Sequence, residues 1–209
     1  MTFSRDERVA LAGLLHRTGP GSPTLCEGWQ TLDLAAHLVL RERRPDAAAG
    51  MLGGPLAGRT ERMQRKLAAK LGYEGLIGAF RDGPPRVSVF AIPGADEAAN
   101  TVEYFVHHED VRRAVPGWAP RDLPEGLSAA LWRRLKSTGL FLRTAPVGIE
   151  LARDDAGTPS RVTVRKGAEL VTVAGTPAEL TMWAMGRTTA ANVRFEGPEA
   201  AVAKLREWR

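Results

Sequence analysis

The sequence predicts an α+β fold with two domains: a helical domain over residues 1–145 and a small α+β domain over 146–209. Two observations favour this division. Before residue 145, apolar residues recur at the three- and four-residue spacings of amphipathic helices, and Gly- and Pro-rich segments separate the runs. After Pro146, apolar and polar residues alternate, as they do in half-buried strands. A chain of 209 residues is long enough for one large domain or two small ones.

Three helices are predicted first. Each has apolar residues at helical spacing and is followed by a Gly- or Pro-containing segment that ends the helix. They are expected over 5–16, 32–44 and 60–80. The inward face of the second also carries two polar residues, His37 and Arg41. Residues 45–58 are too rich in Gly, Ala and Pro for a firm assignment, and residues 81–94 are expected to form a long loop.

Two more helices complete the first domain. One is expected over 96–115 and is closed by a Pro-Gly pair, and the other, over 123–142, has leucines at four-residue spacing. Helices of this length joined by loops are typical of a helical bundle, in which the last helix could also dock against the second domain.

The second domain is predicted to have the element order β-β-β-α-β-α. Its first three strands are expected to pair consecutively as a small meander, with a tight turn at Lys166-Gly167. Thr176-Pro177-Ala178-Glu179 is a capping box with proline at the first helical position. The expected strands are 147–153, 161–165, 168–174 and 192–196, and the expected helices are 177–185 and 198–208.

Composition and charge exclude several classes of protein. The formal net charge is +5 and the pI is about 9.9, but the arginines are spread along the chain, so no specific nucleic-acid partner is expected. No apolar run reaches the length of a membrane helix, and the N-terminus lacks the apolar core of a signal peptide. The single cysteine, Cys26, excludes an internal disulfide. These features predict a cytoplasmic protein.

A metal site is predicted on the helix over 96–115. Residues four and seven apart share a helix face, so Glu103, His107 and Asp110 project the same way, together with apolar Val102 and Val106. A carboxylate and an imidazole on an inward face are costly unless something pairs with them. A divalent metal is the simplest partner that satisfies both.

His37 lies on the inward face of a different helix and can complete the site. One inward histidine is usually a satisfied core residue, but two of them with an inward glutamate favour a metal. Two imidazoles and one carboxylate leave open coordination positions, which is the catalytic rather than the structural pattern for zinc. Zinc is the first choice, and Ni(II), Fe(II) or Mn(II) also suit these ligands. Asp110 would either orient an imidazole or form an ion pair with Arg113 or Arg41.

Other reactive residues have plainer interpretations. His108 is expected to pack with Tyr104 or face solvent, and Glu109 is expected at the surface. Cys26 is expected to pack rather than react, because nothing in the sequence shows the electropositive surroundings that a thiolate needs. Arg187 is either a surface arginine after a helix-ending glycine or a residue that faces the metal of the other domain.

These residues carry a resemblance to a known family. Gly28-Trp29, Asp33-Leu34-Ala35-Ala36-His37 and Glu103-x3-His107-x2-Asp110 resemble the mycothiol-dependent maleylpyruvate isomerase family, a branch of the DinB-like metal-binding bundles. Residues 176–180 through 183–187 look like that family's small second domain. The resemblance implies a four-helix DinB-like bundle, a C-terminal α/β domain of sterol-carrier-like type, metal ligands at His37, Glu103 and His107, and a substrate-site role for Arg187.

The resemblance also implies an activity. The chain would be a mycothiol- or other thiol-dependent isomerase or transferase that acts on a small electrophilic substrate. The oligomeric state is left open between a monomer and a homodimer. Departures from the family pattern at 26–29, 41–44 and His107-His108 indicate a distinct actinobacterial subgroup rather than the isomerase itself. The alternative is a non-catalytic protein that binds a metal or small molecule, or acts in a stress response.

Overall fold

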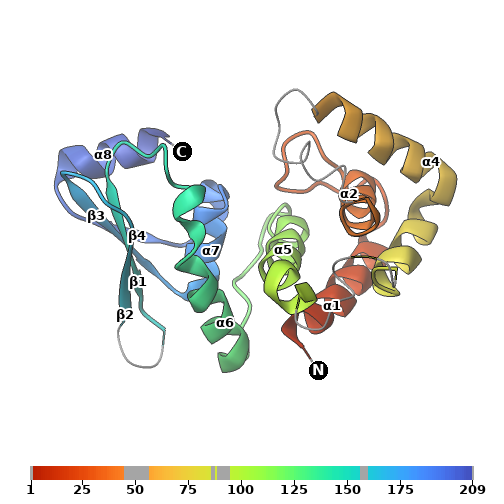
Figure 1. Cartoon of the computed structure of the whole chain (residues 1–209), viewed down its shortest axis with the longest axis horizontal. Coiled ribbons are helices and arrows are strands. Elements are labelled where there is room, and N and C mark those ends of the chain that lie inside the picture. Colours follow the sequence, from red (N-terminus) through yellow and green to blue (C-terminus); the bar gives the residue numbers. More distant parts are fainter. Residues whose placement is uncertain (1, 45–56, 86–87, 89–94, 156–159, 209) are drawn as a thin grey trace. The chain divides into compact units, whose positions relative to one another are not determined.

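The computed structural model describes residues 2–44, 57–85, 88, 95–155 and 160–208 (Figure 1). The chain forms two compact units, Met1–Ala119 and Pro120–Arg209. Helices and a four-stranded sheet are both present, so the predicted α+β class is confirmed. Within the described ranges, no helix has the length and apolar character needed to cross a membrane.

The division between the two units falls after Ala119, which is earlier in the sequence than the boundary predicted near Ala145. Helix α6 (Glu125–Leu135) packs on α7 (Pro177–Ala184), and its Trp132 and Leu135 belong to the hydrophobic core of the second unit. A 3-10 turn, η3 (Thr138–Leu140), follows in place of the last turns of the predicted helix. Periodicity shows that this segment is helical, but not which core its apolar face joins.

The first unit is built from α1 (Phe3–Thr18), α2 (Thr31–Arg43), α4 (Ala57–Arg81) and α5 (Ala95–Arg112). Helix α1 packs on α5 and α4, and α2 packs on α4. Helix α4 bends at Gly72, where φ is +63°, a conformation that favours glycine, so the single helix predicted here has two segments. The fully buried large residues of this core are Leu11, Leu15, Leu34, Leu38, Leu76, Phe80 and Tyr104.

A buried ionic cluster crosses the first unit. Arg8 Nη1 donates to Glu42 Oε1 at 2.6 Å and to the Phe80 carbonyl at 2.8 Å. Its Nη2 donates to Tyr104 Oη at 2.7 Å and to Asp96 Oδ1 at 3.1 Å. Burial raises the pKa of the Glu42 carboxyl, although the charge of Arg8 and the Tyr104 hydroxyl oppose this shift. One arginine on α1 therefore ties together α2, α4 and α5.

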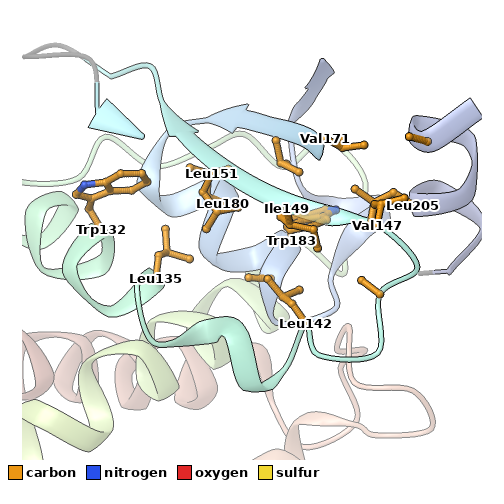
Figure 2. Packing of buried hydrophobic residues seen from close by; sticks show 14 residues of the cluster. Trp132, Leu135, Leu142, Val147, Ile149, Leu151, Val171, Leu180, Trp183 and Leu205 are labelled. Atoms are coloured by element: carbon orange, nitrogen blue, oxygen red, sulfur yellow. The ribbon is translucent and has the colours of Figure 1, made fainter. Parts of the chain in front are cut away.

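The second unit is a four-stranded sheet with helices on one face. Its strands, β1 (Gly148–Arg153), β2 (Ser160–Arg165), β3 (Leu170–Gly175) and β4 (Arg194–Glu196), lie in the order β2-β1-β3-β4. Figure 2 shows Ile149, Leu151 and Val171 of the sheet facing Leu180 and Trp183 of α7. Leu205 of α8 (Glu199–Trp208) joins the same core.

The predicted meander of the first three strands is wrong. Strand β3 pairs in parallel with β1, not with β2. Strand β2 ends beside the start of β1, at the pair Ile149↔Arg165, and β3 begins on the other side of the same end, at Gly148↔Leu170. The short segment between β2 and β3 must therefore cross the start of β1.

Two glycines permit this crossing. A Cβ added to Gly167 would lie 2.3 Å from Gly148 N, and one added to Gly148 would lie 2.8 Å from Gly167 N. Gly148 N also donates to the Glu169 carbonyl at 2.7 Å, which fixes the crossing segment on β1. The segment predicted as a tight turn at Lys166-Gly167 instead belongs to this crossing. The close approach that requires both glycines leaves no mark in the hydrophobic pattern.

Gly167→Ala is expected to destabilise the second unit by about 1–3 kcal/mol, because backbone atoms cannot move aside as a flexible side chain can. Urea unfolding followed by tryptophan fluorescence, to which Trp132 and Trp183 of this core contribute, measures this. The matched control is Gly126→Ala, at an exposed position of α6, where alanine favours the helix. Equal stability of the two variants would contradict the steric argument.

The capping box predicted at the start of α7 is formed only in part. Thr176 Oγ1 accepts a hydrogen bond from Glu179 N at 3.4 Å, and Pro177 begins the helix as predicted. The Glu179 carboxylate instead accepts from Asn192 N at 2.7 Å. It therefore links α7 to the segment that leads into β4.

Candidate metal centre

Helices α2 and α5 bring three predicted ligands together in the first unit. Glu103 Oε1 lies 3.3 Å from His37 Nε2 and 3.3 Å from His107 Nε2. One donor atom from each of the three residues lies within 4.8 Å of the others. The spacing of four between Glu103 and His107 places both on one face of α5, and His37 meets them from α2.

The charges of the three side chains are set by burial and by one another. Burial lowers the pKa of the His37 imidazole, and the neighbouring His107 and Arg41 lower it further. Burial alone would raise the pKa of Glu103, but hydrogen bonds from both imidazoles and the charge of Arg41 hold it well below its usual value. The cluster therefore contains a neutral imidazole and an ionised carboxylate at neutral pH.

His107 is held from its other side by Asp110. Asp110 Oδ2 lies 2.9 Å from His107 Nδ1 and accepts a hydrogen bond from Cys26 Sγ at 3.2 Å. The Asp110 carbonyl also accepts from Leu25 N at 3.0 Å, so the loop before α2 is fixed to α5 at this residue. Burial alone would lower the pKa of His107, but its hydrogen bonds to Asp110, Cys26 and Glu103 raise it well above 6.5.

The donor set suits a divalent metal. Zinc bonds of about 2.0–2.1 Å in a tetrahedron place neighbouring ligand atoms about 3.3–3.4 Å apart, which is the separation between Glu103 Oε1 and each Nε2. Asp110 at His107 Nδ1 matches the outer carboxylate that commonly orients a ligating imidazole. His37 is less well satisfied, since its Nδ1 is buried and has no hydrogen-bond partner among the described residues. The Trp29 ring packs 5.1 Å from the His37 ring.

Comparison with solved structures identifies the fold. A crystal structure of the mycothiol-dependent maleylpyruvate isomerase matches with a TM-score of 0.51 and 19% identity, over 94% of this chain and 92% of that chain. The chain shares the fold of this isomerase. A histidine-to-alanine variant of the same enzyme matches over the same shares, with a TM-score of 0.51 and 20% identity. No protein-family model matches the chain, and no curated protein matches it.

Within this isomerase-like fold, two side chains of α5 that could have faced solvent are buried. His108 does not face solvent: it is 7% exposed, and its Nδ1 lies 3.0 Å from Glu7 Oε2 of α1. The surface position predicted for Glu109 is wrong, because Glu109 is fully buried and accepts a hydrogen bond from Arg113 Nε at 2.6 Å. Helix α5 is covered on several sides, whereas helix phase alone predicts a single inward face.

Two residues near the site were not recognised as part of it. Arg41 Nε lies 3.2 Å from Glu103 Oε1. The sequence indicates this position of Arg41, because Arg41 follows His37 by four residues and residues four apart share a helix face. Cys26 was expected only to pack, yet its thiol contacts Asp110. It lies in an irregular loop, where no periodicity indicates which way a side chain points.

Arg187 lies in the second unit. It follows Gly186, whose φ of +89° ends α7, and its Nη1 donates to the Met185 carbonyl at 2.7 Å. The helix-ending glycine agrees with the plainer interpretation made from the sequence. The predicted role of Arg187 at the metal stays a prediction.

Metal binding is expected to release a proton at pH 6.5. Because its pKa is raised well above 6.5, His107 carries a proton in the metal-free protein, whereas a metal binds only the neutral imidazole. The Glu103 carboxyl, with its lowered pKa, is already ionised. About one proton should leave per metal bound, and the apparent association constant should fall up to about tenfold per pH unit below the pKa of His107.

Calorimetric titration of the metal in two buffers of different ionisation enthalpy measures the released proton. Asp110→Asn is the informative comparison, because it removes the negative acceptor that raises the pKa of His107. This variant should release fewer protons per metal ion bound than the wild type at the same pH. Binding without proton release by the wild-type protein would contradict the prediction.

Proposed function

We propose that the first unit binds a divalent metal through His37, Glu103 and His107, and that the metal activates a thiol for attack on a small electrophilic substrate. The observation that carries the proposal is the convergence of both imidazole Nε2 atoms on Glu103 Oε1, at 3.3 Å each. Asp110 supports it, since it holds the second nitrogen of His107. Zinc is the proposed metal, and Ni(II), Fe(II) and Mn(II) suit the same donors.

Three protein ligands leave a coordination position for an exogenous group, as in catalytic rather than structural sites. A divalent metal held here would lower the pKa of a bound thiol and supply a thiolate nucleophile at neutral pH. The protein would contribute a fixed ligand geometry, with His37 and His107 nearly buried. The Glu103 side chain is 27% exposed, more than either imidazole, so a small molecule would approach from its side.

The reaction class that we propose is thiol-dependent isomerisation or transfer, with mycothiol as the thiol. The shared fold with the mycothiol-dependent maleylpyruvate isomerase supports this choice. In the same proposal, Arg187 binds a substrate carboxylate, a task that suits a planar guanidinium. The two units would then be a DinB-like four-helix bundle and a sterol-carrier-like α/β domain of an actinobacterial, cytoplasmic protein.

The proposed function predicts metal-dependent thiol chemistry. Metal-loaded protein incubated with mycothiol and either maleylpyruvate or a chromogenic model electrophile should give turnover, followed by absorbance. Turnover should fall sharply after chelation and return when metal is added back, because a divalent metal held by His37, Glu103 and His107 would lower the pKa of the thiol. His107→Ala should be inactive, whereas His16→Ala, at an exposed position 3.0 Å from Glu74, should keep full activity. Metal binding without turnover of any electrophile would instead favour the non-catalytic alternative.

A further inference from the structure

Arg41 places a positive charge directly beside the candidate metal centre. It follows His37 by one turn of α2, and its Nε lies 3.2 Å from Glu103 Oε1, the oxygen that both imidazoles approach. Its side chain is only 18% exposed. The charge is therefore less screened by solvent than that of a surface arginine.

A chain of hydrogen bonds holds the Arg41 guanidinium in place. Its Nη1 donates to Asn100 Oδ1, and its Nη2 donates to the Ala99 carbonyl at 3.4 Å. Asn100 is fully buried, and its Nδ2 donates to Asp96 Oδ1 at 2.8 Å. Asp96 in turn accepts from Arg8 at 3.1 Å. Arg41 is thus connected to the buried ionic cluster of the first unit and is fixed against Glu103.

The charge balance of the site shows what Arg41 contributes. A divalent ion would be neutralised by two carboxylates, Glu103 as a ligand and Asp110 beside His107. Both imidazoles would be neutral once they bind the metal. Arg41 adds one positive charge, so that the loaded centre keeps a net charge of about +1 toward a group that enters the open position.

We infer that Arg41 makes the open position of this centre selective for an anionic ligand, such as a thiolate or carboxylate, over a neutral donor of similar size. The inference rests on the proposed metal site and adds a specificity-determining residue to it. A neutral ligand gains nothing from the Arg41 charge, so the two kinds of ligand should respond differently when that charge is removed.

The test uses full-length protein loaded with Co(II), whose visible absorption reports changes in coordination. Azide serves as the anionic probe and imidazole as the neutral one. In Arg41→Met, the affinity for azide should fall by about tenfold or more, while the affinity for imidazole stays within about twofold. Arg41→Lys keeps the charge and should retain most of the azide affinity. Arg43→Met, at an exposed position two residues on, should match the wild type.

The outcomes separate this inference from the proposed function. Equal weakening of azide and imidazole in Arg41→Met would show a purely structural role, and unchanged azide affinity would show no role; either result overturns the inference while leaving the metal site intact. Failure of the wild-type protein to bind Co(II) would overturn the metal site itself, and the inference with it. If Arg41→Met does not fold, Arg41→Gln removes the same charge and is judged by the same comparison.

Discussion

The double variant His37→Ala/His107→Ala is expected to lose its bound metal. Only Glu103 would remain of the three proposed ligands, and its carboxylate would keep Arg41 as a competing partner. Loss of an outer partner of a metal ligand already costs about 10–100-fold in affinity, so loss of two ligands should cost about a thousandfold or more. Elemental analysis of the purified protein and competition with a chromophoric chelator measure the effect.

Two controls make this result specific. His16→Ala removes an exposed histidine at the end of α1 and should leave the metal content unchanged. Far-ultraviolet circular dichroism should show that the double variant keeps its helices, because both alanines favour a helix. Undiminished metal content in the double variant would mean that the metal is held elsewhere, and the proposed function would fail.

Arg8→Leu is expected to lower the free energy of unfolding of the first unit by about 3–5 kcal/mol, because it leaves buried charge without its partner. Glu42 is 1% exposed, and its Oε2 has no hydrogen-bond partner among the described residues. Without Arg8, burial would raise the pKa of this carboxyl further. The carboxyl would then either be protonated or, if it stayed ionised, strongly destabilise the folded state. Urea unfolding followed by circular dichroism measures the loss.

The matched control for Arg8→Leu is Arg5→Leu, at an exposed position of the same helix, which should change stability by less than about 0.5 kcal/mol. Adding Glu42→Met to Arg8→Leu removes the second buried charge and should restore part of the stability. If the double variant were as unstable as Arg8→Leu alone, packing of the arginine rather than charge pairing would be the cause.

Much of the fold could be predicted because the spacing of apolar residues along the chain directly indicates helices and strands. The helices that carry the site begin and end within a few residues of their predicted limits, and His37, Glu103 and His107 were placed on inward faces by helix phase alone. The structure brings those three side chains together; their role as ligands stays a prediction. Phase is enough here because the site lies where two regular helices face each other.

Other features could not be predicted because they depend on which surfaces meet. Helix α5 is covered on more than one side, so Glu109 and His108 are buried although they lie off the predicted inward face. The parallel pairing of β3 depends on a crossing permitted by Gly148 and Gly167, which alternation cannot reveal. Cys26 reaches Asp110 from a loop whose path is set by hydrogen bonds rather than by a repeating pattern.

Helix α5 makes contacts from more than one face, and this limits how its length can change in evolution. One face carries the candidate ligands, and another places Tyr104 and His108, four residues apart, against Arg8 and Glu7 of α1. A single inserted or deleted residue would rotate everything beyond it by about 100°. Both sets of contacts would be lost at once. Homologous proteins can therefore exchange side chains along α5 one at a time, but should tolerate changes of length only in the segments outside it.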